Sequence, residues 1–457
     1  MFLIILFLIV FLFYRQALFY YFISDDFLGF TKIKNLFDLI KIDPNNNHYS
    51  PVVKIIGFFL TKIAVYNPLP YHLYTIIVHL LNIYLVYCLS KLFINDRLRN
   101  ILSAIIFAFF FANYEVVFWY GGSNNSLLVT FYILSLLSLI KFIKTKKNLF
   151  SILFQTGFIC ALLTHEYAIS LIPVGVIYWW LFTGKKNWKE FIKLFSVPVF
   201  VVVLTFFLKT IFVRISLLVR TPSVLKFIAF TLRSFVYLFI GNPYIVDKIP
   251  NFFIPIIFLV ILFFLFKFTK NKRTLFLLIW ASFTIFVYSL TSAPQARYFY
   301  LSFVPIVIYL LSVIKVRQII PIFYLLFIFI SGVVFLQNQK YYWQLSSRIT
   351  KNVINDVKKY SQPLQKTEVL YFVNLPDSSN DSIWKAYIFR AGFKELLNNF
   401  VNIYPEKIIL LTSFKPTSHT IEAPYISPKK LSELKQKNTV FIYREDLKSV
   451  ILVPSHP

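Results

Sequence analysis

The sequence predicts an α-helical polytopic membrane protein with a small α/β domain at its C-terminus. Of its 457 residues, 58% are hydrophobic and only 14% are charged, whereas a soluble domain is usually about a quarter charged. Apolar runs of roughly twenty residues, the length that crosses a bilayer, recur as far as residue 337. The remaining chain is polar and interspersed with proline. We therefore expect a membrane domain over residues 1–337 and a soluble domain over residues 338–457.

Eleven apolar segments of the membrane domain are predicted to cross the bilayer. The first segment lacks the basic start and the small-residue cleavage site of a signal peptide, so we expect it to be retained. Cys88 and Cys160 lie in apolar segments and form neither a disulfide framework nor a metal-binding motif. The predicted spans lie near residues 1–23, 70–93, 101–119, 126–143, 149–165, 167–183, 191–213, 251–267, 274–291, 300–314 and 318–337.

Basic residues are concentrated in every second loop, and the positive-inside rule places those loops in the cytoplasm. Eleven spans that start inside end outside. This predicts a multi-pass protein of the plasma (inner) membrane with a cytoplasmic N-terminus and an extracytoplasmic C-terminal domain. The same topology explains the net charge of +28, so we expect membrane lipids and no nucleic acid as partners. The basic loops are 91–99, 141–147, 185–193, 267–273 and 315–317.

Two further segments carry basic residues within apolar sequence. Residues 51–66 contain Lys54 and Lys62, and residues 224–241 contain Arg233. We expect both to form amphipathic helices on the outer surface, because a crossing by only one of them would break the charge alternation. The sequence leaves open whether both cross.

The soluble domain combines strand-like and helix-like patterns. The stretches "EVLYFVNL" and "KIILLTSF" are predicted to form buried strands, and "SIWKAYIFRAGFKELLNNF" is predicted to be helical. A chain of this length suffices for one small α/β domain.

The candidate functional residues all fall in loops predicted to face the exterior. Placing an ionisable group within the membrane costs free energy, so such groups usually indicate a functional cavity. A carboxylate there can act as a general base, and a planar guanidinium matches the oxygens of a phosphate. The candidates are Asp25, Asp26, His48, Glu115, His165, Glu166, Arg297 and Tyr298.

Sugar transfer from a polyprenyl-phosphate donor needs such groups at this height. The lipid tail of the donor stays in the bilayer, and its phosphate lies at headgroup level. A base deprotonates an acceptor hydroxyl, which attacks the anomeric carbon, and an arginine holds the departing phosphate. The acceptor could be a protein, a glycan or a lipid.

Several motifs resemble those of GT-C-type glycosyltransferases. "SDDF" after the first span, followed by "HYSPVVKIIGFFLTKI" and "NPLPYHLYTIIVHLLNIYLVYCL", looks like the opening of these enzymes. "NYEVVFWYGGSNNSLL" is similar to the H-x-x-E-x-V-x-W-x-x-G-R motif of the transmembrane-and-TPR O-mannosyltransferases and their bacterial relatives. "LLTHEYAI" resembles their L-x-K-E-x-x-I motif, and "ARYFYL" resembles the R-Y segment of the wider protein-mannosyltransferase and aminoarabinose-transferase group. The likeness covers roughly residues 20–310.

The resemblance implies a GT-C fold and an inverting transfer of a hexose-type sugar. It implies that Asp25 or Asp26 is the catalytic base and that Arg297 grips the lipid phosphate. Glu115 and Glu166 would be active-site carboxylates, with Glu115 catalytic. The chain departs from the family pattern at three places: no histidine precedes the first glutamate, Ser123 or Asn124 replaces the arginine of the G-R pair, and His165 replaces a lysine.

The remaining candidates, His48, His165, Glu166 and Tyr298, are expected to contact the donor phosphate or the rest of the substrate. No cofactor is certain. Carboxylates could hold Mg²⁺ or Mn²⁺, but the first outer loop has no D-x-D spacing. Metal-independent transfer is therefore the preferred hypothesis.

Two other function classes stay open. A transporter or flippase of lipid-linked saccharides would place ionisable groups near the midplane and often shows paired repeats, neither of which the sequence shows clearly. Another membrane transferase, either an O-antigen ligase or an acyltransferase, would also use an outer cavity. An acyltransferase needs a histidine with an acid partner, and His48 and His165 are its candidates.

Overall fold

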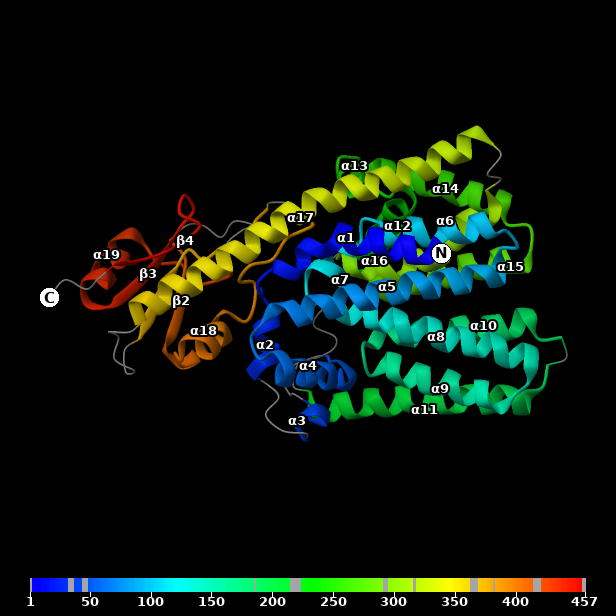
Figure 1. Cartoon of the computed structure of the whole chain (residues 1–457), viewed down its shortest axis with the longest axis horizontal. Helices are drawn as coiled ribbons and strands as arrows, with labels where there is room; N and C mark the ends of the chain where they lie inside the picture. Colours follow the sequence, from blue (N-terminus) through cyan, green and yellow to red (C-terminus); the bar gives the residue numbers. More distant parts are fainter. Residues whose placement is uncertain are drawn as a thin grey trace.

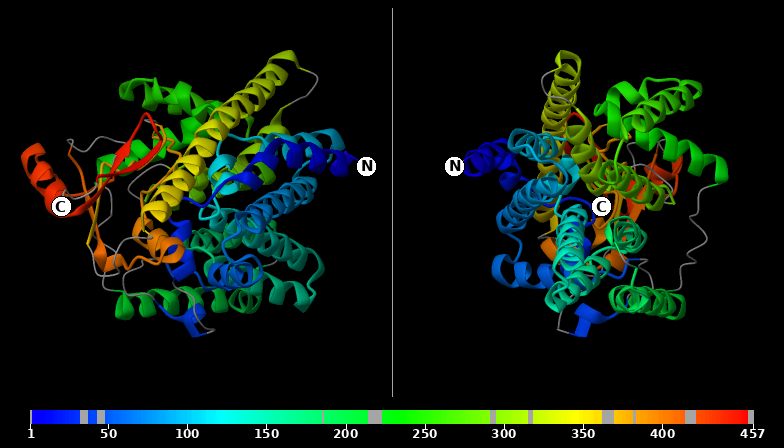
Figure 2. Two further views of the ribbon diagram at one scale, coloured as in Figure 1. Left: turned by 60° about the vertical axis from the view of Figure 1, so that its left-hand side comes forward. Right: turned by 90° about the vertical axis from the view of Figure 1, so that its right-hand side faces the viewer.

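The protein consists of a helical bundle with a four-stranded sheet domain beyond one end (Figure 1). The right view of Figure 2 shows the bundle from the end that lies away from the sheet domain. The computed structural model describes residues 2–31, 37–42, 48–184, 186–213, 223–290, 295–314, 318–361, 369–380, 383–413 and 421–453.

Each predicted span overlaps at least one helix of the bundle. Seven of the described helical segments are long and apolar enough to cross a membrane, and the chain is a multi-pass membrane protein. The helices that overlap the predicted spans are α1 (Phe2–Tyr14), α5 (Pro68–Phe93), α6 (Arg97–Ala108), α8 (Ser123–Thr145), α9 (Asn148–Leu162), α10 (Leu171–Phe182), α11 (Trp188–Phe212), α14 (Ile254–Phe268), α15 (Lys272–Ser289), α16 (Ala296–Val313) and α17 (Ile319–Ser361).

Side-chain caps define many of the helix starts. The Asn67 side chain accepts the Leu69 N–H at the start of α5, and the Asp96 side chain accepts the Arg99 N–H at the start of α6. Asn271 forms a capping box at the start of α15. Such caps satisfy backbone donors that have no partner within the helix, so the polar residues between apolar runs determine where these helices begin.

The predicted span 101–119 is interrupted. Helix α6 ends at Ala108, and a short helix, α7 (Asn113–Phe118), follows. The Asn113 side chain donates to the Phe107 and Ala108 carbonyls at 2.7 and 2.9 Å, and Tyr14 Oη donates to the Ala108 carbonyl at 3.0 Å. These polar side chains satisfy the carbonyls that the break would otherwise leave unpaired, as buried backbone requires.

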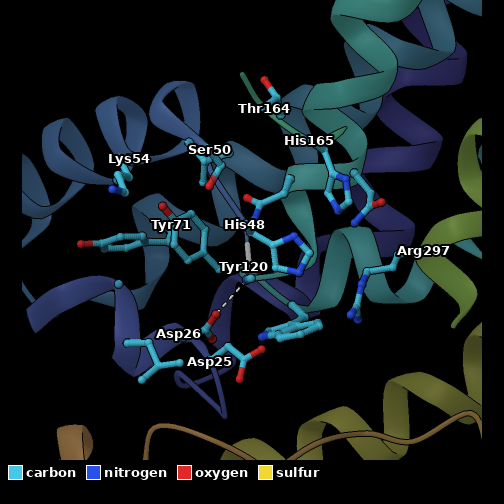
Figure 3. Close-up of a pocket in the computed structure, with 18 of the residues that line it drawn as sticks. Asp25, Asp26, His48, Ser50, Lys54, Tyr71, Tyr120, Thr164, His165 and Arg297 are labelled. Carbon is cyan, nitrogen blue, oxygen red and sulfur yellow. Dashed lines mark hydrogen bonds between the residues drawn. The ribbon is translucent and has the colours of Figure 1, made fainter. Parts of the chain in front are cut away.

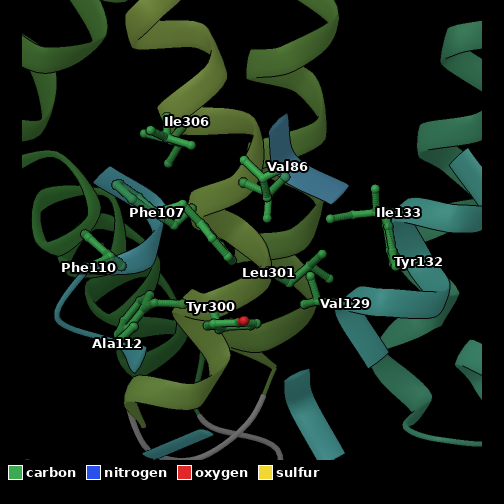
Figure 4. Packing of buried hydrophobic residues seen from close by; sticks show 14 of the residues in the cluster. Val86, Phe107, Phe110, Ala112, Val129, Tyr132, Ile133, Tyr300, Leu301 and Ile306 are labelled. Atoms are coloured by element: carbon green, nitrogen blue, oxygen red, sulfur yellow. The ribbon is translucent and has the colours of Figure 1, made fainter. Parts of the chain in front are cut away.

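Helix α16 lies at the centre of the bundle, and α14 lies at its periphery. The most apolar window of α16 is 78% buried, whereas that of α14 is only 11% buried. Around α16, buried side chains of α5, α6 and α8 form the core that Figure 4 shows near Tyr300 and Leu301. The side chains of α14 are exposed to the surroundings, as expected of a helix that contacts lipid.

The two predicted amphipathic segments are helical. They correspond to α4 (Pro51–Ala64) and α12 (Val224–Ile240). Helix α4 contacts α5 and the short helices α2 (Asp26–Thr31) and α3 (Phe37–Ile40), at the end of the bundle that faces the sheet domain (Figure 1). Helix α12 packs on α14 and α15. Their placement relative to a bilayer stays a prediction.

The C-terminal sheet has the order β2-β1-β3-β4. Strand β1 (Leu370–Val373) is parallel to β2 (Ile408–Leu411) and β3 (Thr439–Arg444), and β3 is antiparallel to β4 (Ser449–Val453). The two predicted strands are confirmed as β1 and β2, and the small α/β domain is as expected. Its helices are α18 (Phe393–Val401) and α19 (Pro428–Lys437).

The predicted helix over residues 382–400 is wrong in its first half. Residues 383–392 are extended and bent, and α18 begins only after Gly392, whose φ is +76°. The Ile388 N–H donates to the Asp377 carbonyl at 2.9 Å, and Tyr387 forms an antiparallel bridge with Ser378. Pairing with a neighbouring segment therefore replaces helix formation here.

Helix α17 joins the two parts of the molecule without interruption. It has 43 residues and runs from the bundle to the sheet domain (Figure 1). The predicted domain boundary between residues 337 and 338 falls inside this helix.

Candidate active site

A cavity of about 420 Å³ opens among α2, α4 and the start of α16 (Figure 3). Its walls come from α2, α4, the link between α7 and α8, the turn before α10, and the start of α16. Seven of the eight predicted site residues line it, and Glu115 lies behind Arg297. The seven are Asp25, Asp26, His48, His165, Glu166, Arg297 and Tyr298.

Asp26 is the buried member of the acidic pair. It is 2% exposed, and its Oδ1 and Oδ2 accept the N–H groups of Gly121 and Ile23 at 2.8 and 3.1 Å. Burial raises the pKa of Asp26 to about 7, although these hydrogen bonds oppose the shift. Asp26 thus ties the loop before α2 to the link between α7 and α8.

Asp25 is exposed at the cavity. Its Oδ1 accepts a hydrogen bond from Ser24 Oγ at 3.4 Å. In the part of the chain that the structure describes, no cation lies within ion-pair distance of this carboxylate. Both neighbouring acids line the cavity (Figure 3), and Asp25 is the more exposed of the two.

Arg297 is held in place by Glu115 of α7. Glu115 is 1% exposed, and its Oε2 accepts the Arg297 N–H at 2.9 Å and lies 3.5 Å from Arg297 Nη1. The guanidinium lies over the rings of Trp119 and Tyr298, with its carbon 5.0 and 5.3 Å from the ring centroids. The carboxylate also lies at the N-terminus of α16, where the helix dipole favours negative charge.

Glu166 has three nitrogen neighbours. Its Oε1 lies 2.9 Å from His48 Nδ1 and 3.3 Å from Lys209 Nζ, and its Oε2 lies 3.6 Å from His165 Nδ1. Burial would raise the pKa of Glu166, but His48 and Lys209 outweigh it and hold this pKa well below its usual range. Glu166 is therefore an ionised group whose charge is already balanced.

His165 is neutral under ordinary conditions, because burial lowers its pKa to about 3. Its Nδ1 accepts the Tyr167 N–H at 3.4 Å, and its ring stacks on the Tyr167 ring at 4.3 Å. These contacts orient the imidazole at the cavity wall. Since Nδ1 accepts the Tyr167 N–H, the neutral ring carries its proton on Nε2 and can donate a hydrogen bond but supplies no charge.

Lys209 was not among the predicted site residues. It lies in the last turn of α11, and only 7% of its side chain is exposed. The signal available in the sequence is a lysine at the end of an apolar span, on the side otherwise poor in basic residues. A lysine at such a position is usually expected to extend its ammonium group to the membrane interface. Here the ammonium group of Lys209 pairs with Glu166 instead.

A cluster of potential metal ligands is formed by His48, His165 and Glu166, whose ligand atoms lie within 4.8 Å of one another. Two imidazoles and a carboxylate suit zinc or a similar transition metal better than Mg²⁺ or Mn²⁺, which prefer oxygen. Lys209 also competes for Glu166. Both oxygens of Asp26 are occupied by backbone N–H groups. The side chains of this cluster and of Asp26 therefore do not fit Mg²⁺ or Mn²⁺, and metal-independent transfer stays the preferred hypothesis.

No protein-family model and no curated protein matches the sequence. Among solved structures, the chain is similar to ArnT from Cupriavidus metallidurans bound to undecaprenyl phosphate. The TM-score is 0.53 at 12% identity, over 97% of this chain and 93% of ArnT. This likeness confirms the predicted GT-C-like fold. The narrower resemblance to O-mannosyltransferases stays a prediction.

Proposed function

We propose that the protein is a membrane glycosyltransferase that moves a hexose-type sugar from a polyprenyl-phosphate donor to an acceptor hydroxyl, with inversion. The reaction would take place at the outer face of the plasma (inner) membrane. One observation carries the proposal: Asp25, which forms no ion pair among the described residues, and Arg297, backed by Glu115, face the same cavity. The fold neighbour, which was crystallised with undecaprenyl phosphate, supports the donor class.

Arg297 is the proposed phosphate ligand. A guanidinium has five N–H donors, and the contact with Glu115 uses only Nη1 of its side chain. The aromatic faces of Trp119 and Tyr298 limit how far the group can move. A preorganised cation of this kind stabilises the charge that develops on a departing phosphate. In this arrangement Glu115 is a positioning residue rather than the base.

Asp25 is the proposed general base. It takes the proton of the acceptor hydroxyl while the hydroxyl oxygen forms a bond to the anomeric carbon. The bond between that carbon and the phosphate oxygen breaks at the same time. The polyprenyl phosphate leaves with the electron pair, and Arg297 stabilises its added negative charge. Asp26 does not take part directly, because its oxygens bind Ile23 and Gly121.

The proposed reaction is tested with Asp25→Asn and Asp26→Asn variants in membranes supplied with a polyprenyl-phosphate hexose and extracts of the cell envelope. Release of polyprenyl phosphate and labelling of protein, glycan and lipid fractions are measured together, so the assay also identifies the acceptor class. We expect Asp25→Asn to abolish both signals. Full transfer by a correctly folded Asp25→Asn variant would exclude Asp25 as the base.

A second function is favoured by one contact. His48 and Glu166 form a histidine–acid pair at 2.9 Å, the arrangement that an acyltransferase needs. Lys209 already pairs with Glu166, and this pairing weakens the ability of Glu166 to activate His48. Assays with an acyl donor and with a polyprenyl-phosphate sugar separate the two functions. Acyl transfer by the wild-type protein that is lost in His48→Ala would favour the acyltransferase, and sugar transfer without any acyl transfer would exclude it.

A transporter is supported less well. The ionisable groups of the cavity gather at one end of the bundle (Figure 3), whereas transporters bind substrate near the midplane. The buried His79, which lies within α5, bonds Tyr300 Oη at 2.8 Å and the Ala108 carbonyl at 3.3 Å. These bonds give it a structural role at the break between α6 and α7.

A further inference from the structure

Residues 383–392, named the strap here, connect the sheet domain to the end of the bundle. Trp384 anchors the strap: it is 1% exposed, and its Nε1 donates to Asp247 Oδ2 at 2.7 Å. The indole lies 5.1 Å from the Tyr237 ring and 5.7 Å from the Phe111 ring. The strap is therefore inserted among bundle residues and does not merely cover them.

The strap binds the residue that precedes Asp25. The Ser24 N–H donates to the Ile388 carbonyl at 2.8 Å. Ser24 is 1% exposed and has a φ of +47°, a left-handed conformation that a non-glycine residue keeps only when its surroundings enforce it. The hydrogen bond to the strap is one of the contacts that hold Ser24 in this conformation, and this conformation determines where Asp25 lies.

Gly392, at the end of the strap, lies against the same residue. Its φ is +76°, and a Cβ atom there would lie 2.7 Å from the Ser24 carbonyl oxygen and 3.2 Å from Phe27 Cβ. Real Cβ atoms do not approach an oxygen so closely, so any side chain would push the loop and the strap apart. Helix α18, which follows, also contacts α2, and the rings of Phe400 and Phe27 lie 5.8 Å apart.

The strap also supports the cationic side of the cavity. Tyr387 is 3% exposed, and its ring lies 5.5 Å from the Trp119 ring. Trp119 is the ring over which the Arg297 guanidinium lies. The strap thus touches one neighbour of the acid and one neighbour of the cation.

We infer that the strap is a positioning element of the active site, which holds Asp25 through Ser24 and Arg297 through Trp119. Its chemical role rests on the proposed function; its contacts do not. Asp25 and Arg297 come from segments far apart in the sequence, so their separation depends on groups that contact both. Since a displacement of about 1 Å can lower a rate by roughly a hundredfold, the strap should control kcat without contacting the substrate.

The test compares Gly392→Ala with Asn402→Ala. Asn402 is another left-handed residue of the sheet domain, with φ +60°, at the end of α18. Alanine strains the backbone at both positions, but only Gly392→Ala places a Cβ against Ser24. Amide hydrogen exchange over residues 22–27 and steady-state transfer are measured on the full-length protein. A Trp384→Phe variant, which removes the bond to Asp247 and keeps an aromatic ring, serves if Gly392→Ala does not fold.

We expect Gly392→Ala to speed exchange of the Ser24 amide at least tenfold and to lower kcat tenfold to a hundredfold, with the KM for the donor changed less than twofold. Asn402→Ala should leave both readouts near the wild-type values. Unchanged exchange at Ser24, or faster exchange with unchanged kcat, would overturn the inference. If the wild-type protein shows no sugar transfer, the proposed function fails, and exchange at Ser24 alone then decides whether the strap holds the loop.

Discussion

The cavity brings together two acid-bearing regions that differ in how their charges are balanced. In the loop before α2, Asp25 is exposed and forms no ion pair among the described residues, although its charge acts on Arg297 from a greater distance. In the turn before α10, Glu166 contacts His48, His165 and Lys209. A carboxylate already paired with cations is a poor proton acceptor. The comparison shows that acids in one cavity of a membrane protein are not equivalent, and this difference is the reason for proposing Asp25 as the base.

The largest effect is expected for Asp25→Asn, which removes the proposed base and keeps the size of the side chain. General-base catalysis contributes roughly a hundredfold to ten-thousandfold, so we expect kcat to fall by about that factor with the fold intact. Initial rates and thermal unfolding in detergent check this. The matched control is Glu166→Gln: if it lowers kcat as much as Asp25→Asn, the two regions do not differ as proposed.

The next effect concerns the Glu115–Arg297 pair. Arg297→Lys keeps a positive charge but loses the planar fork, and Glu115→Gln keeps a similar shape but loses the charge that orients Arg297. We expect a kcat about tenfold to a hundredfold lower for each, and little additional loss when both are combined, because both changes act through one group. If the loss of kcat in the double variant equals the product of the two single losses, Glu115 acts independently of Arg297.

A smaller effect is expected in the region of Glu166. Lys209→Met leaves the partly exposed Glu166 carboxylate with one cation fewer, which should reduce stability by about 1 kcal/mol and change kcat less than tenfold. Adding Glu166→Gln should restore part of that stability, since the unbalanced charge is then gone. Thermal melts of the two single variants and the double variant measure this coupling. If the double variant loses as much stability as the two single variants together, Lys209 and Glu166 are not coupled.

The smallest effect is a pH dependence that distinguishes the two neighbouring acids. Burial raises the pKa of Asp26 from 3.8 to about 7, so the folded state holds its proton more tightly than the unfolded state does. The resulting stabilisation is complete below pH 4 and is lost as the pH rises through 7, by an amount on the order of 1–4 kcal/mol.

Melting temperatures between pH 4.5 and 8 would measure this loss. Asp26→Asn should flatten the profile, even though it lowers stability overall by weakening one backbone contact. Asp25→Asn should keep most of the slope, because the Asp25 charge makes only a minor contribution to the raised pKa of Asp26. A profile as flat as that of Asp26→Asn would show that the loss of stability does not come from Asp26.

Much of the architecture could be predicted because it depends on local patterns. Apolar runs identified the helices of the bundle, and the loops between them identified the side on which Asp25, Glu166 and Arg297 meet. The break after Ala108 could not be predicted, because the groups that satisfy its carbonyls include Tyr14, which is 94 residues away. Span length alone favours a continuous helix there.

The site details depended on similar long-range contacts. The sequence leaves open which of Asp25 and Asp26 is the base. The burial of Asp26 and its bonds from Ile23 and Gly121 distinguish the two acids, and the bond from Gly121 comes from a distant segment. Lys209 became a site residue because α11 ends beside Glu166. The strap was predicted to be helical because its pairing partner, residues 377–378, lies in a separate segment.

Helix α17 has a mechanical consequence. Its 43 residues correspond to a rod of about 65 Å at 1.5 Å per residue, roughly twice the thickness of the hydrocarbon layer. The sheet domain is therefore carried on a stiff lever rather than on a hinge. Because Trp384 also anchors the strap in the bundle, the sheet domain is held at two points, and a rigid helix and a buried indole together determine its position relative to the cavity.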